Sequence, residues 1–285
     1  MFGNRVVILS VAMMLVAGCI HGQSGSAGAV SSVLQQALDG PHRSAANRAR
    51  DVARKPAETL AFWGFSPDMT VVEVWPGGGW YTEVLAPALR ENGRLIAASF
   101  PESAKPPFRA AIGRDYLAKL AAIPDVYDRV EVVPFDPPEY TALAPAGTAD
   151  MVILSRHFHN FIAAGIVDEV LASALEALRP GGVLAIVQHR ALPDAVPEWE
   201  QRSGYVREQW LIETVTSAGF ILQAVSSMHH NPRDSRAHDD GVWSLPPSFR
   251  TCSRMEASTE KQACLDRFTA IGESDRMTLK FVKPG

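Results

Sequence analysis

The feature that most constrains the fold is an alternation between short, apolar, β-branched stretches and longer amphipathic ones. Strand-type stretches lie at 70–75, 94–99, 130–133, 150–154, 183–188, 220–226 and 277–282. Helix-type stretches lie at 45–63, 80–90, 108–122, 166–178 and 207–218. Strands that are apolar on both faces and alternate with amphipathic helices belong to a parallel sheet covered on both sides. With right-handed crossovers, the sequence predicts an α/β fold with a Rossmann-like, doubly wound sheet.

In such a sheet, ligands bind beyond the carboxyl ends of the strands, near the point where the strand order reverses. This rule selects five segments as candidate site segments. They are Trp75–Gly79, Ser99–Glu102, Phe135–Asp136, Ser155–Asn160 and Gln188–Arg190.

The first of these segments belongs to a strand–loop–helix motif that runs VVEVWPGGGWYT over residues 71–82. Glycines let a ligand approach the backbone, and a helix start offers free N–H groups. Dinucleotide enzymes use G-x-G-x-x-G with an acidic residue about 20 positions later. No such register fits here, the second strand ends in Ala98-Ser99-Phe100, and the acid stands inside the first strand at Glu73.

An acid two positions before a glycine loop, followed by an aromatic helix start, resembles motif I of class I S-adenosylmethionine-dependent methyltransferases. Four further segments resemble this family in the right order: Phe135-Asp136, Ala149-Asp150-Met151-Val152, residues 178–184 and Ser217-Ala218-Gly219-Phe220. The resemblance covers residues 45–230 and the final strand. It implies a seven-stranded, mostly parallel sheet with an antiparallel last strand. More narrowly, the chain is similar to a group of predicted extracytoplasmic methyltransferase-like lipoproteins.

The resemblance implies S-adenosyl-L-methionine as the cofactor. In the family, the glycine loop contacts the methionine end of the cofactor, and an acid after the third strand lies near the adenine amino group. The implied contacts here are Glu73, which would order the loop, and Trp75, Pro76, Gly77, Gly78, Gly79, Tyr81, Ser99 and Asp136.

Two positions depart from the family pattern. Trp75 stands where the family has the first loop glycine, beside the path of the methionine part. The acid that binds the ribose hydroxyls is absent from the end of the second strand, and Glu102 follows Ser99 by three residues. These departures favour an alternative in which the fold serves as a non-catalytic ligand-binding module.

His157, His159 and Asn160 follow the fourth strand, in the loop that lines the acceptor pocket of the family. Methyl transfer requires alignment of the acceptor and, where needed, removal of its proton. Histidine is a suitable base near neutral pH. We expect these three residues to be catalytic, with His157 or His159 as the base or as an orienting group. The alternative is a purely structural role at the sheet edge.

Five of the eight histidines follow predicted strands: His157, His159, His189, His229 and His230. Imidazoles are ligands for zinc and copper, so a metal-assisted enzyme is a third functional alternative. The chain lacks the H-x-x-E-H and C-x-x-C spacings that would support it, and we predict no metal site.

Residues 231–275 interrupt the alternation and are predicted to form an insertion or lid beside the site. This segment contains Cys252 and Cys264, which are either a disulfide or two separate thiols. Six charged residues in or beside this segment either form a solvated, salt-bridged loop or bind an acidic acceptor. They are Arg233, Asp234, Arg236, Arg250, Asp275 and Arg276.

The N-terminus reads as a secretory signal: Arg5 precedes a short apolar run that is too short to span a bilayer. Its end, Leu15-Val16-Ala17-Gly18-Cys19, resembles a bacterial lipoprotein box, which implies a signal peptide over 1–18 and a lipidated Cys19. Ile20 after the cysteine favours the outer membrane, facing the periplasm. We expect residues 19–44 to be a tether and residues 45–285 to form the domain.

The formal net charge of -4 argues against a nucleic-acid partner, which would require a basic face. The expected partners are instead a small-molecule or lipid-like methyl acceptor and the membrane, through Cys19. The sequence does not identify the acceptor.

Overall fold

The computed structural model describes residues 24–285. The expected signal peptide and the expected lipidation site at Cys19 lie outside the described residues. Within residues 24–285, no helix is both long and apolar enough to cross a bilayer.

The core of the molecule is one seven-stranded sheet with the order β3-β2-β1-β4-β5-β7-β6. Strands β1 to β5 are parallel neighbours, and β7 pairs antiparallel with both β5 and β6. This confirms the predicted doubly wound sheet with its antiparallel last strand. The strands are β1 (Thr70–Val74), β2 (Arg94–Ser99), β3 (Glu131–Pro134), β4 (Ala149–Ser155), β5 (Leu178–His189), β6 (Ile221–Ser226) and β7 (Arg276–Val282).

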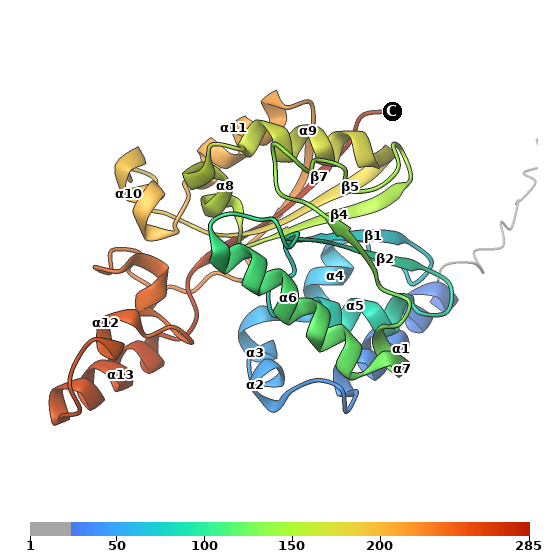
Figure 1. Cartoon of the computed structure of the whole chain (residues 1–285). Coiled ribbons are helices and arrows are strands. Elements are labelled where there is room, and N and C mark those ends of the chain that lie inside the picture. The colour runs from blue at the N-terminus through green and yellow to red at the C-terminus, as the bar shows by residue number, and fades with distance from the viewer. Residues whose placement is uncertain (1–23) are drawn as a thin grey trace, which may run out of the picture.

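Helices cover both faces of the sheet, as Figure 1 shows. One layer contains α1 (Ser24–Asp39), α4 (Pro56–Trp63), α5 (Thr82–Leu89), α6 (Pro107–Ala122) and α7 (Pro124–Tyr127). The other contains α8 (Phe158–Ala164), α9 (Val167–Ala177) and α11 (Glu208–Ser217). Short helices α2 (Ala45–Arg48), α3 (Asp51–Arg54) and α10 (Pro197–Ser203) lie at the periphery.

The period of two along a strand explains how β1 joins both layers. Val71 packs into the core under α5, whereas Val72 and Val74 pack into the opposite core with α8 and α9. All three side chains are almost fully buried. A strand buried on both faces reads as a continuous apolar run, which is why the sequence located this sheet so closely.

The expected tether at 19–44 is helical over much of its length, which is a correction. Val30, Val33, Leu34, Ala37 and Leu38 recur at helical spacing, and they pack against the core that contains α5. The Gly- and Ser-rich composition of residues 20–32 hid this stripe. The domain described here therefore begins before residue 45.

Residues 231–275 form a helical insertion between β6 and β7 that contains no strand, and we name it the lid. It contains a 3-10 turn (Gly241–Ser244), α12 (Arg250–Ser253) and α13 (Thr259–Ile271). Cys252 and Cys264 form a disulfide with an Sγ–Sγ distance of 2.01 Å, which settles the alternative left open by the sequence. In Figure 1, α12 and α13 project away from the sheet.

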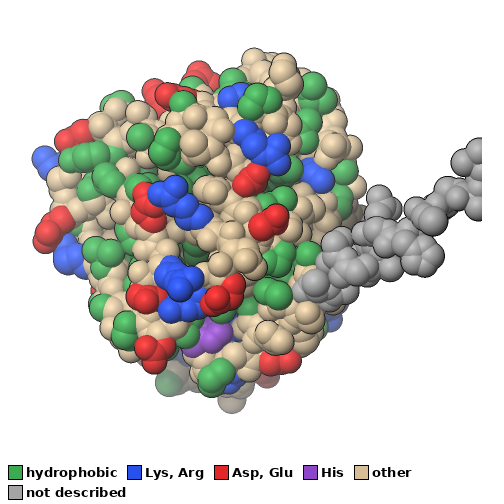
Figure 2. All heavy atoms as spheres, turned by 90° about the vertical axis from the view of Figure 1, so that its right-hand side faces the viewer, with side chains coloured by type: hydrophobic (Ala, Val, Ile, Leu, Met, Phe, Trp, Pro, Cys, Tyr) green, Lys and Arg blue, Asp and Glu red, His purple; other side chains and the backbone are tan. Residues whose placement is uncertain are grey.

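The face shown in Figure 2 carries acidic and basic side chains next to one another, with hydrophobic side chains scattered between them. On this face, the positive charge is not gathered into a single broad patch. The arrangement agrees with the weak net negative charge of the chain.

Candidate functional site

The glycine loop turns sharply off β1, as the sequence predicted. Gly77 and Gly79 have φ values of 56° and 72°, a region that favours glycine. A Cβ at Gly79 would lie 3.2 Å from the side chain of Lys119, whereas a Cβ at Gly77 or Gly78 would meet nothing within 4 Å. Lys119 Nζ donates to the Gly78 carbonyl at 2.9 Å and so holds the loop from α6. The loop is therefore open on the side of Gly77 and Gly78.

Glu73 lies beneath the loop and ties it to the start of α5. The Thr82 hydroxyl donates to Glu73 Oε2 at 2.6 Å and lies 3.0 Å from the Tyr116 hydroxyl. Burial raises the pKa of Glu73 to about 7, against the opposing hydrogen bond from Thr82 and the charge of Lys119. This geometry fits the expected role of Glu73 in ordering the loop.

Trp75 occupies a glycine-like position with a side chain that glycine lacks. Its φ is 49°, in the left-handed region, and only 3% of the residue is exposed. The indole Nε1 donates to the Phe135 carbonyl at 3.0 Å. The ring centroid lies 4.5 Å from Phe100 and 4.8 Å from Phe161. The indole thus spans the ends of β1, β2 and β3 as a packed wall.

A cavity of 380 Å³, which we name the tryptophan cavity, lies between this wall, the glycine loop and α8. Its lining includes Trp75, Gly77, Phe100, Arg109, His157 and Asn160. Trp75 and Gly77 both line it, so the indole does not close the mouth of the loop. The cavity lies at the carboxyl edge of the sheet, where the topology predicts a ligand.

The remaining expected cofactor contacts differ in placement. Asp136 binds Arg109 Nη1 at 2.9 Å, and Arg109 also lies over the rings of Trp75 and Phe100. Ser99 is buried at the end of β2. Tyr81 packs between Trp63 and Trp80, with ring centroids 6.0 and 4.7 Å away. Of the nine expected contacts, only Trp75 and Gly77 are among the residues that line the tryptophan cavity.

A second cavity, of 230 Å³, lies between the carboxyl ends of β4 and β5 and the lid. We name it the arginine cavity. It brings together His157, His159, Asn160 and His189, and its lining also includes Arg50, Arg156, Trp243, Ser248, Glu273 and Ser274. His157 and Asn160 line both cavities and therefore form a wall that the two share.

Buried contacts fix the protonation state of His159. Gln188 Oε1 accepts from the Phe158 amide at 3.2 Å, and Gln188 Nε2 donates to the Gly204 carbonyl at 2.9 Å. This orientation makes Gln188 Nε2 the donor to His159 Nδ1, 3.2 Å away. His159 Nδ1 is then an acceptor, and a neutral ring carries its proton on Nε2.

Both catalytic candidates are neutral at physiological pH. Burial, followed by the charge of Arg156 and the proximity of His159, lowers the pKa of His157 to about 3. Burial is also the main cause that lowers the pKa of His159 to about 4. Imidazoles of such low basicity are weak general bases. The geometry therefore favours an orienting role over the proton-removing role that the sequence left open.

His229 and His230 do not join this group. His229 lies 2.8 Å from the Arg54 carbonyl and 2.6 Å from Thr278 Oγ1, and His230 lies 3.0 Å from Asp275. In the part of the chain described, no group of three or more His, Cys, Asp or Glu side chains could hold a metal ion. The metal-assisted alternative thus has no ligand set there.

No individual role was predicted for Arg50, Phe100, Arg109 or Arg156, although each lines one of the two cavities. Topology placed Phe100 and Arg156 within the candidate segments at the ends of the second and fourth strands. Arg50 directly precedes α3 and Arg109 lies in α6, and nothing in their local sequence shows which sheet edge they approach.

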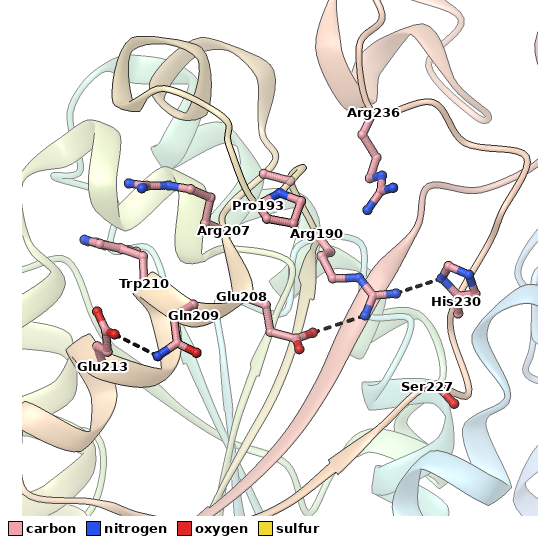
Figure 3. Close-up of a pocket in the computed structure, with 11 residues that line it drawn as sticks. Arg190, Pro193, Arg207, Glu208, Gln209, Trp210, Glu213, Ser227, His230 and Arg236 are labelled. Carbon is pink, nitrogen blue, oxygen red and sulfur yellow. Dashed lines mark hydrogen bonds and ion pairs between the residues drawn. The ribbon is translucent and has the colours of Figure 1, made fainter.

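A third cavity, of 670 Å³, lies between β6, the start of α11 and the lid (Figure 3). Its central cation, Arg190, binds Asp275 through two nitrogens, each 3.0 Å from a carboxylate oxygen. Arg190 also binds Glu208 at 3.2 Å and points toward His230 in Figure 3. The positive charge of Arg190 is therefore balanced by the carboxylates of Asp275 and Glu208.

No protein-family model and no curated protein matches the chain. Solved structures do match. An S-adenosylmethionine-dependent methyltransferase from Aquifex aeolicus is 20% identical, with 69% of this chain and 92% of that chain covered and a TM-score of 0.51. The [4+2]-cyclase SpnF is 15% identical, with 92% and 95% covered and a TM-score of 0.54.

Geranyl diphosphate C-methyltransferase from Streptomyces coelicolor A3(2) is also similar, at 12% identity, with 87% of each chain covered and a TM-score of 0.53. Its structure contains Mg²⁺, geranyl diphosphate and S-adenosyl-L-homocysteine. Similarity at these identities establishes the architecture. The protein has the fold of the class I S-adenosylmethionine-dependent methyltransferases.

Proposed function

We propose that the protein is an S-adenosyl-L-methionine-dependent methyltransferase, with the cofactor in the tryptophan cavity and the acceptor in the arginine cavity. The observation that carries this proposal is the wall shared by the two cavities, formed by His157 and Asn160. A group-transfer enzyme must bring two substrates together at one point, and ligands in adjoining cavities would meet at this wall. The fold and the glycine loop support the same reading.

The tryptophan cavity fits one part of the cofactor better than the other. Gly77 and Gly78 leave open space on the loop, as the methionine end requires. The adenine end lacks the contacts expected from the family, because Arg109 already binds Asp136 and Ser99 stands in place of the ribose acid. A cofactor bound here would rest against Trp75 and Phe100 and would depend mainly on stacking for its adenine.

When bound, the cofactor supplies a methyl group on a sulfonium ion. The residues of the shared wall would hold and orient the acceptor. Neutral His159 carries its proton on Nε2, and Asn160 Nδ2 lies 3.4 Å from His157 Nδ1. Because His157 and His159 are weak bases, the best acceptor atom is one that needs no proton removed by these rings.

We also propose that the enzyme acts in the bacterial cell envelope, on a small or lipid-like acceptor. The support comes from the signal-like residues 1–18 and from Cys19. Two acyl chains on that cysteine would anchor the protein stably, since each buried methylene contributes about 0.8 kcal/mol. Mass spectrometry of the protein purified from its membrane fraction tests this. A mature chain that begins at an unmodified residue would contradict it.

Isothermal titration with S-adenosylhomocysteine tests the cofactor proposal. We expect a Kd below about 1 mM for the wild-type protein. Gly77→Leu should weaken binding about tenfold or more, because its side chain would project into the tryptophan cavity. Gly181→Leu is the matched control, since both glycines have positive φ and open space around a Cβ.

Binding weaker than about 1 mM by the wild-type protein would remove the support for a transferase. An equal loss of affinity in both glycine variants would trace the effect to backbone strain and not to the cavity.

One observation favours a second function, that of a non-catalytic ligand-binding module. Trp75 and the Arg109–Asp136 pair occupy positions where the family contacts its cofactor. Mass spectrometry of small molecules that co-purify with the protein separates the two functions. A nucleoside supports the transferase, whereas another ligand in the absence of any nucleoside supports the binding module.

A further inference from the structure

The arginine cavity has an excess of positive charge that its own acids do not balance. Four arginines, from α3 and its flank, the end of β4 and the start of β7, lie around one carboxylate, Glu273. Ion pairs join Glu273 to Arg50 at 2.6 Å, to Arg54 at 3.3 Å and to Arg276 at 3.2 Å. Among residues 24–285, no other carboxylate forms an ion pair with these arginines. Asp275, the neighbour of Arg276 in the chain, binds Arg190 and His230 instead.

Arg156 is the arginine without a partner. It lines the cavity, and its guanidinium forms no ion pair or hydrogen bond with any residue from 24 to 285. Its only recorded hydrogen bond is from its backbone amide to the Val187 carbonyl, at 2.7 Å. Its φ of 63° lies in the left-handed region, which costs on the order of 1–3 kcal/mol for a residue with a side chain. The fold therefore maintains a strained backbone that directs an unpaired cation to the cavity.

The surroundings show the effect of this uncompensated charge. Burial and then Arg156 lower the pKa of Arg54 to about 8. Arg54 Nη2 is buried without a hydrogen-bond partner among the described residues. Burial lowers the pKa of His189 well below its usual value, with further lowering by His159, Arg156, Arg276 and Arg54. Uncompensated buried charge is unfavourable unless a counter-ion occupies the site.

The groups that face Arg156 are suited to an oxyanion. Arg50 and Arg156 can both donate to oxygen atoms, and Asn160, Ser248 and Trp243 add neutral polar groups to the lining. Glu273 is the one acid in the lining, and its pKa, which burial alone would raise, is lowered to about 2 by Arg276, Arg54 and Arg50. A volume of 230 Å³ corresponds to roughly eight water molecules, enough for a phosphate or carboxylate with a short carbon stem.

We propose that the arginine cavity binds an oxyanion, a phosphate or carboxylate group, through Arg156 and Arg50, and that this group belongs to the methyl acceptor. Identifying the anion as part of the acceptor rests on the proposed transferase function, whereas anion binding itself does not. The third cavity provides the contrast, since its Arg190 is already neutralised by Asp275 and Glu208.

The test measures anion binding without any cofactor. Inorganic phosphate, acetate and glycerol 3-phosphate are each titrated into the purified protein at constant ionic strength, with chloride as the balancing salt. We expect at least one of them to bind and to raise the Tm. Phosphate and acetate distinguish the two anion types, and glycerol 3-phosphate reports whether a phospholipid headgroup fragment binds better than free phosphate.

Arg156→Gln should weaken the binding about tenfold or more, and Arg156→Lys should restore part of it. Without anion, Arg156→Gln should be at least as stable as the wild type, because it removes repulsion and breaks no ion pair. Arg179→Gln is the control, since Arg179 is half exposed, binds Asp150 at 2.5 Å and lies at the opposite end of the sheet.

The inference is overturned if none of the three anions raises the Tm beyond chloride, or if Arg156→Gln binds them as the wild type does. Loss of folding in Arg156→Gln would also overturn it, because it would give Arg156 a structural partner. Anion binding without S-adenosylhomocysteine binding keeps this inference and removes the transferase proposal. S-adenosylhomocysteine binding without anion binding overturns this inference and leaves the transferase proposal in place.

Discussion

The tryptophan cavity and the arginine cavity share a wall but differ in how their side chains are satisfied. In the first, the indole of Trp75 donates to a carbonyl, and Arg109 is paired with Asp136. Beside the second, three arginines share Glu273, and a fourth, Arg156, has no ion pair among the described residues. The polar groups of the tryptophan cavity named here have partners within the protein. The arginine cavity has an unpaired positive charge that a ligand can neutralise. Unsatisfied charge is therefore the better guide to where an anionic ligand binds.

The largest expected effect comes from removing the indole that walls the tryptophan cavity. Trp75→Gly should lower the free energy of unfolding by about 3 kcal/mol, because a large buried side chain is lost. Relief of the left-handed backbone strain offsets about 1 kcal/mol of the loss. Urea denaturation measures the change. A variant as stable as the wild type would show that the indole is not part of the core, and the comparison would fail.

The next effect concerns Glu73 beneath the loop. Its folded pKa of about 7 lies above the ordinary value of 4.5, so the stability associated with its protonated form is fully present below about pH 4.5. That stability is lost as the pH rises through about 7. Glu73→Gln keeps an acceptor for Thr82 and does not ionise. It should match the wild type at about pH 4 and exceed it by about 3 kcal/mol at about pH 8.

Thermal unfolding of both proteins across this pH range tests the Glu73 prediction. A stability difference that stays constant with pH would show that Glu73 does not titrate there. A difference that grows toward low pH would indicate a carboxylate that is ionised in the folded protein.

The smallest effect compares the paired arginine with the unpaired one. Arg109→Gln should lower the free energy of unfolding by about 1 kcal/mol, because it leaves Asp136 without its partner and removes the contacts with two rings. Arg156→Gln should cause no such loss. Parallel urea titrations check the pair, and equal losses in the two variants would mean that the cavities do not differ as described.

Much of the fold followed from local pattern. The strand predicted at 94–99 coincides with β2, and the predicted strand at 277–282 differs from β7 by one residue. The chain turns at Gly77 and Gly79, as predicted from the glycines of this loop. Helix α1 was missed because Gly, Ser and Ala mask the apolar stripe that packs on α5. Helix α8 was missed because its residues were assigned to a loop.

The candidate site was also predicted only in part. The sequence placed His157, His159 and Asn160 at the carboxyl edge of the sheet, and the structure brings them into one cavity with His189. It did not predict the low basicity of His157 and His159, because that depends on burial and on Arg156. It also did not predict that Tyr81 packs away from the tryptophan cavity against Trp63.

The sequence by itself determined the parallel sheet and the sharp loop between Pro76 and Trp80, and by resemblance the antiparallel last strand. These follow from the period of apolar residues and from the conformations open to glycine, which are local properties of the chain. Only the tertiary structure decided the charges of the site. Arg50, Arg156 and Glu273 are far apart in the chain, and whether each finds a partner depends on the three-dimensional meeting of α3, β4 and the lid.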